Sequence, residues 1–166
     1  MKLASRFALI LLIAGLVAAP SAQAQAVDAT RPLLQLHAEG VDFTGHPFQS
    51  DIFIYQSGYT LLAYSAETGN ASRVARGVAT LSDLRLLNQA LSAGRVGQQA
   101  GRCGGPAADY VSTYGITWHG KQRVRTFTVG GNYTDCSSEV KRIMDGTCRF
   151  IWSVLGPSPE VCVPPA

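Results

Sequence analysis

The four cysteines of this 166-residue chain constrain its fold more than any other feature of the sequence. They are Cys103, Cys136, Cys148 and Cys162. An even set of cysteines pairs into disulfides in an oxidising compartment. The alternative, a metal site, is disfavoured because no two of the cysteines have CxxC spacing, and neither His37 nor His46 is near one in the sequence. We therefore expect two disulfides, with no metal and no other cofactor.

The first 24 residues are typical of a bacterial signal peptide. Lys2 and Arg6 flank the start of an apolar run from Phe7 to Ala19, and Ala22-Gln23-Ala24 supplies the small residues of a cleavage site. The run is shorter than the roughly 20 apolar residues that span a bilayer. We expect residues 1–24 to be removed and residues 25–166 to form a single domain. That domain would lie in the periplasm or outside the cell, with no stable membrane insertion.

The charge balance of the predicted domain argues against nucleic acid as a partner. Without Lys2 and Arg6, the basic count falls from 14 to 12, against 11 acidic residues. The two signs are also well mixed along the chain. A nucleic-acid binder would carry a dense positive patch or stripe instead.

Alternating hydrophobicity and turn residues predict strands along the first 80 residues. The predicted strands are 33–37, 51–55, 59–64 and 73–79, with a loop over 40–50. The second and third strands flank Ser57-Gly58, so we expect them to form a hairpin.

Two later segments have helical periodicity. Thr80 and Asp83 form a variant of the capping box before a predicted helix over 81–93, and Gly94 takes the C′ position. A second helix is expected from Asp135 or Cys136 to Gly156-Pro157, continuous through Asp145-Gly146. Between the helices we expect a crossing loop over 94–106 and strands over 110–118 and 122–129.

This order of elements predicts an α+β domain. We expect an antiparallel sheet of about five to six strands with two helices packed on one face. The similar segments Tyr59–Ala63 and Tyr114–Trp118 allow a duplicated strand-strand-helix unit, although shared strand chemistry explains the similarity equally well.

Spacing selects one disulfide pairing. On the predicted second helix, Cys136 and Cys148 are twelve residues apart, about 18 Å of rise, which is too far for a bond. From Leu155 the chain to Cys162 reaches at most about 25 Å, less than the roughly 28 Å back to Cys136. We therefore expect Cys103–Cys136 and Cys148–Cys162, the second tethering the C-terminal tail.

The second predicted hairpin is the candidate binding surface. It carries aromatic and cationic side chains, which protein interfaces enrich. The residues are Trp118, His119, Lys121, Arg123, Arg125 and Phe127. The alternative is that Trp118 and Phe127 belong to the core and the arginines to a solvated face. The stretch from Tyr114 to Arg123 reads Y-x-I-x-W-x-G-K-x-R and resembles small secreted bacterial domains, a resemblance that implies no functional residue.

No motif in the sequence predicts a catalytic or cofactor-binding residue. His37, His46 and His119 fall in different segments, and no GxSxG turn surrounds a serine. The glycine-rich segments match neither phosphate-binding pattern. We expect a non-catalytic binding or inhibitor-like protein of the cell envelope or exterior, whose partner is a protein. A small hydrolase that uses a histidine and a structural envelope component are the alternatives.

Overall fold

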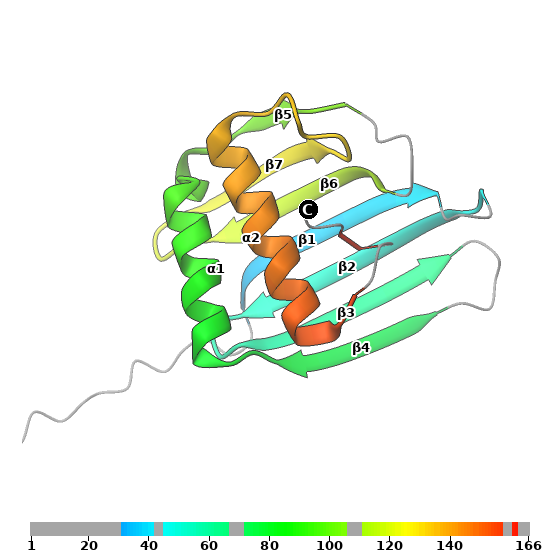
Figure 1. The fold of residues 1–166 in the computed structure, drawn as a ribbon, viewed down its shortest axis with the longest axis horizontal. Coiled ribbons are helices and arrows are strands. Elements are labelled where there is room, and N and C mark those ends of the chain that lie inside the picture. The colour runs from blue at the N-terminus through cyan, green and yellow to red at the C-terminus, as the bar shows by residue number, and fades with distance from the viewer. Residues whose placement is uncertain (1–30, 42–44, 67–71, 106–110, 158–160, 163–166) are drawn as a thin grey trace, which may run out of the picture.

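The fold is a seven-stranded sheet with one layer of two helices on one of its faces (Figure 1). The computed structural model describes residues 31–41, 45–66, 72–105, 111–157 and 161–162. The predicted signal peptide, residues 1–24, lies outside these ranges. In chain order the elements are β1 (Pro32–Val41), β2 (Pro47–Tyr55), β3 (Tyr59–Ala66), β4 (Arg73–Val78), α1 (Leu81–Ala93), η1 (Val96–Gln98), β5 (Gly101–Cys103), β6 (Val111–His119), β7 (Val124–Gly130) and α2 (Ser138–Leu155).

The sheet has the strand order β4-β3-β2-β1-β6-β7-β5. All neighbours are antiparallel except β5, which runs parallel to β7. The predicted α+β class is thus confirmed, with more strands than the expected five to six. The additional strand, β5, lies inside the expected crossing loop. Its three residues are too few to produce a recognisable alternation in the sequence.

The strands β1 and β2 extend beyond their predicted ranges. Pro47 to Ser50, expected in a loop, belongs to β2. The reason is burial on the helix-covered face: Phe48 is buried and its ring stacks on that of Tyr64 at 5.7 Å. This tertiary contact outweighs the turn preference of Gly45 and Pro47.

The core lies between the sheet and the helices. Alternate residues of the central strand, Leu34, Leu36 and Ala38, are fully buried toward the helices. The second helix contributes the largest buried set: Val140, Ile143, Met144, Thr147, Cys148, Phe150 and Ile151. No helix in the described part of the chain is long and apolar enough to cross a membrane.

The first helix begins where the sequence predicts, and its end differs in one respect. Thr80 and Asp83 form a complete capping box. Gly94 is the C-cap itself, in right-handed helical geometry, and the left-handed residue is Arg95, with φ 49°. Glycine is needed at position 94 for another reason: a Cβ there would lie 2.6 Å from the carbonyl oxygen of Glu139 and would collide with Ile143. Gly94 therefore allows the end of α1 to lie against α2.

The second helix is continuous through Asp145-Gly146, as predicted, and Gly156 caps its end with φ 84°. A Cβ on Gly146 would collide with Ala90 of α1. The glycine that suggests a break in the sequence is thus a second point of close helix packing.

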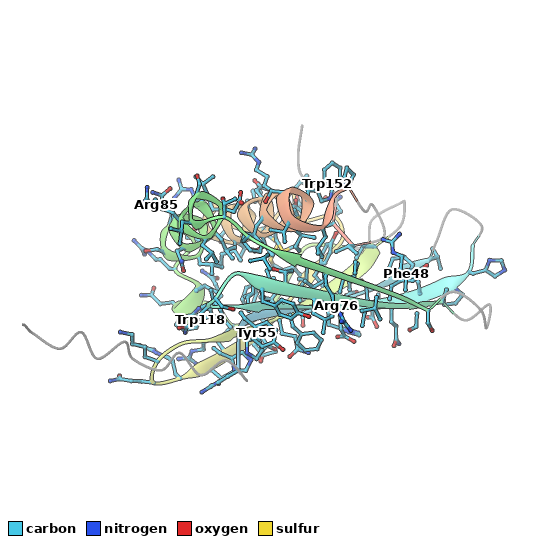
Figure 2. The ribbon with its side chains drawn as sticks, turned by 90° about the horizontal axis from the view of Figure 1, so that it is seen from below. Phe48, Tyr55, Arg76, Arg85, Trp118 and Trp152 are labelled. Carbon is cyan, nitrogen blue, oxygen red and sulfur yellow. A yellow bond between two sulfur atoms is a disulfide. The ribbon has the colours of Figure 1, made fainter. Side chains whose placement is uncertain are left out.

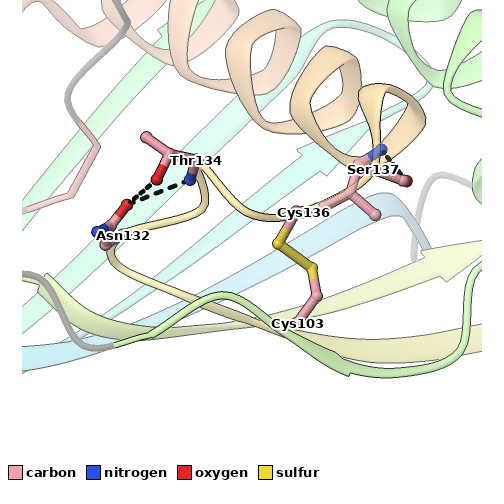
Figure 3. Close-up of a disulfide and its surroundings, with 6 residues drawn as sticks. Cys103, Asn132, Thr134, Cys136 and Ser137 are labelled. Carbon is pink, nitrogen blue, oxygen red and sulfur yellow. Dashed lines mark hydrogen bonds between the residues drawn. A yellow bond between two sulfur atoms is a disulfide. The ribbon is translucent and has the colours of Figure 1, made fainter.

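Both predicted disulfides are present. Cys103–Cys136 joins β5 to the loop before α2, and Cys148–Cys162 joins the middle of α2 to the tail. Figure 3 shows the first bond beside Asn132, whose Oδ1 accepts hydrogen bonds from the backbone and hydroxyl of Thr134. The expected helix start at Asp135 or Cys136 was wrong, since Ser137 is the N-cap and its hydroxyl accepts from the backbone N–H of Val140 at 3.3 Å.

The close approach at Gly94 gives a stability prediction. Gly94→Ala should lower the free energy of unfolding by about 1–3 kcal/mol, because the added methyl group must displace Ile143 or the backbone of Glu139. The matched control is Gly105→Ala, where the methyl group meets no atom within 4 Å and the change should be near zero. Urea unfolding of both variants tests this. Equal effects would show that α1 and α2 are not closely packed at Gly94.

Candidate functional site

The structure brings four of the six predicted surface residues together. Trp118, His119, Lys121 and Arg123 line a hollow of about 520 Å³ at one end of the sheet, hereafter the end hollow. Phe127 is buried in the core, where it cannot meet a partner. Arg125 lies outside the lining and donates from Nε to the carbonyl oxygen of Gly97 at 3.2 Å.

Segments distant in sequence build the end hollow. The β6–β7 turn, which projects at the left of Figure 1, provides one wall. The C-terminal part of α1 and η1 provide another, through residues such as Asn88, Ser92 and Gln98. Leu33 from β1 and Gln56 from the β2–β3 turn complete it.

Trp118 packs at the centre of this arrangement because two glycines leave room for its indole ring. A Cβ on Gly97 would be 3.1 Å from Trp118 Cζ3, and one on Gly120 would collide with the ring. The indole therefore lies against η1 and the hairpin turn. Figure 2 shows Trp118 between α1 and the β6–β7 hairpin. The result is a half-buried aromatic surface held in a fixed position.

The described residues that line the end hollow carry charge of one sign, although the positive charge of Arg95 also acts on Glu139, outside the lining. Arg95, Lys121 and Arg123 contribute three cations, and no aspartate or glutamate is among the described residues that line it. Arg95 was not predicted as a site residue. It is the only described non-glycine residue with positive φ, a conformation that costs free energy and often marks a functional position. The backbone N–H of Arg95 donates to Ser92 O at 3.0 Å, which helps to hold this geometry.

His119 extends the cationic region to Arg31. The Arg31 Nε donates to His119 Nδ1 at 3.0 Å, so this ring nitrogen is an acceptor and Nε2 carries the proton of the neutral ring. The pKa of His119 is lowered, first by desolvation and then by the positive charge of Arg31. The neutral imidazole is thus the favoured form at this site.

Two other depressions have different chemistry. A groove of about 610 Å³ between α1 and α2 mixes Arg142 and Arg149 with Asp83 and Asp145. A hollow of about 570 Å³ at the opposite end of the sheet includes Glu39, and none of the described residues that line it is a cation. The concentration of positive charge around an aromatic ring is therefore specific to the end hollow among these three.

The sequence did not predict a histidine–aspartate pair on the other face of the sheet. His37 Nδ1 and Asp51 Oδ1 are 2.9 Å apart, because the β1–β2 register places the two residues opposite each other. The two segments read separately as a short strand and a hairpin, and only their pairing reveals the contact. Asp51 lies within β2, which begins four residues before the predicted strand 51–55.

Within the described ranges, no three histidine, cysteine, aspartate or glutamate side chains are placed to hold a metal ion. A scan against family models found none that matches the chain, and a search of curated proteins found none similar to it. The interpretation of the end hollow therefore rests on its own geometry and charge.

The Arg31–His119 contact gives a pH prediction. Neutral His119 contributes stability that is complete above the ordinary histidine pKa and is lost as the pH falls through the lowered pKa of the folded state. An NMR titration of His119 should give a midpoint below that of a histidine in an unfolded peptide. Arg31→Ala should raise the midpoint part of the way, because desolvation remains. An unchanged midpoint in this variant would contradict the contact.

Proposed function

We propose that this chain is an exported binding protein that receives a carboxylate-bearing segment of a protein partner in the end hollow. The observation that carries the proposal is the set of three cations, Arg95, Lys121 and Arg123, around Trp118 with no carboxylate in the described lining. Guanidinium groups bind carboxylates through paired hydrogen bonds. The exposed part of the indole ring offers apolar contact next to them.

The size of the hollow suits an anchor point within a larger interface. Its volume of about 520 Å³ is within the usual range of binding pockets. Interfaces depend on a few aromatic and arginine residues near their centre, and the end hollow concentrates both kinds. The polar residues Asn88, Ser92 and Gln98 add hydrogen-bonding groups at its walls.

The two disulfides support the exported location in this proposal, because such bonds persist in oxidising compartments. They also brace the elements beside the hollow: Cys103 follows η1 by five residues and is linked to the loop that starts α2. A braced site loses less conformational entropy when it binds a partner.

A histidine-dependent hydrolase is the second candidate, because His37 and Asp51 have the geometry of a general base and its orienting acid. Among the described residues, no serine, threonine or cysteine side chain is seen bonded to His37, so such an enzyme would have to activate water. A hydrolytic activity abolished by His37→Ala would favour this candidate over the binding protein.

Charge reversal tests the proposed binding site. Fluorescence anisotropy with a labelled hexaglutamate peptide should detect binding, and hexaglutamine should not bind. In the double variant Lys121→Glu/Arg123→Glu the affinity for hexaglutamate should fall about tenfold or more, since a hydrogen bond to a charged group contributes about 1.5 kcal/mol or more.

The control is Arg85→Glu, which reverses an exposed cation of α1 outside the end hollow. It should leave the affinity nearly unchanged. An equal loss in the control would show that the peptide follows overall charge, and failure of hexaglutamate to bind the wild-type protein would overturn the proposed site.

A further inference from the structure

Among the described residues that line the end hollow, His119 is the only one whose charge changes in the neutral and mildly acidic range of pH. The ordinary pKa of a histidine is about 6.5, whereas lysine and arginine stay protonated throughout this range. The remaining lining residues are polar or apolar and carry no charge. The net charge of the lining therefore depends on pH through one imidazole ring.

The neutral ring of His119 is held by an arginine from a distant segment. Arg31, which directly precedes β1, donates from Nε to Nδ1 of His119 at 3.0 Å. A further proton must add at Nδ1, because Nε2 already carries the hydrogen of the neutral ring. Protonation removes the lone pair that accepts from Arg31 and leaves two positive groups facing each other. Protonation of His119 and its hydrogen bond to Arg31 therefore exclude each other.

The charged groups that face His119 are cations. Arg31 contacts it directly, and Lys121 and Arg123 belong to the turn that follows it. The segment after α1 contributes Arg95 to the lining, and β1 and the β2–β3 turn contribute uncharged residues. Desolvation and the charge of Arg31 lower the pKa of His119, and no carboxylate among the described residues opposes them. The free hollow therefore favours the neutral ring.

An anion in the end hollow reverses this balance. A carboxylate placed among the cations can accept a hydrogen bond from the protonated imidazole, and hydrogen bonds between charged groups are stronger than neutral ones. A bound carboxylate therefore raises the pKa of His119. Because the coupling between two binding events is reciprocal, a proton on His119 raises the affinity for the carboxylate by the same factor.

We propose that His119 is a pH-dependent binding residue of the end hollow, which on protonation releases Arg31 and binds the carboxylate-bearing segment together with the three cations. This inference rests on the proposed binding function and adds its regulation. The neutral ring gives the weaker-binding form of the site and the protonated ring the tighter-binding form. The partner is therefore held more tightly as the pH falls, until its own carboxylates are protonated at about pH 4.

Fluorescence anisotropy with labelled hexaglutamate tests the proposal on the oxidised protein. The matched variant is His119→Asn, whose Oδ1 replaces Nδ1 as the acceptor for Arg31 and does not titrate. Between about pH 8 and about pH 5.5, the affinity of the wild-type protein relative to this variant should rise about fivefold or more. The comparison cancels the titration of the peptide. His46→Asn, which removes an exposed histidine outside the hollow, is the control that should keep the wild-type pH dependence.

Two further measurements follow the proton itself. In an NMR titration, hexaglutamate should raise the midpoint of His119 above its value in the free protein. In Arg31→Ala the rise in affinity should begin at a higher pH than in the wild-type protein, because the cation that competes with the proton is gone.

The outcomes separate the regulation from the site. If the wild-type protein and His119→Asn bind hexaglutamate with the same pH dependence, the regulation is overturned and the binding site stands. A midpoint of His119 that hexaglutamate leaves unchanged would have the same meaning. Failure of hexaglutamate to bind at any pH would overturn both.

Discussion

The docking of α2 against the sheet is the contact on which the rest of the structure depends. This helix contributes the largest set of buried residues, and it meets α1 at two positions, Gly94 and Gly146, where only a hydrogen fits. One disulfide lies just before its first turn and the other begins at its middle. Both bonds restrict the unfolded chain and lower its conformational entropy. This effect stabilises the fold by about 3–4 kcal/mol for each bond. For a domain of ordinary stability, about 5–15 kcal/mol, that is a large share.

Two consequences for function follow from this arrangement. First, the approach of α1 to α2 fixes where α1 ends, and the chain then turns through Arg95 in a left-handed conformation before η1 packs on Trp118. The end hollow is therefore a product of helix packing, although its most recognisable residues come from a hairpin. Second, both helices pack on the same face of the sheet. The other face is left to carry the His37–Asp51 pair.

Local signals predicted most of the fold. The capping box at Thr80 fixed the start of α1, and the hairpin at Ser57-Gly58 and the continuous α2 were also confirmed, because each depends on neighbours in the sequence. The disulfide pairing was right even though Cys136 precedes the helix, because distances along the chain still separate it from Cys148 and Cys162. Strand register is non-local, so the sequence could not predict the pairing of His37 with Asp51 or the short strand β5. The same limit applies to the site. Four hairpin residues of the end hollow were predicted from the sequence, whereas Arg95 is brought to the hollow only by the packing of α1 against α2.

The claim that two disulfides hold α2 in place is tested most directly by non-reducing peptide mapping of the purified protein. The structure predicts that Cys103 is recovered only with Cys136, that Cys148 is recovered only with Cys162, and that no thiol reacts with an alkylating reagent before reduction. A peptide joining Cys103 to Cys148, or four free thiols in the folded protein, would contradict this account. With four free thiols, α2 would be held on the sheet by packing alone.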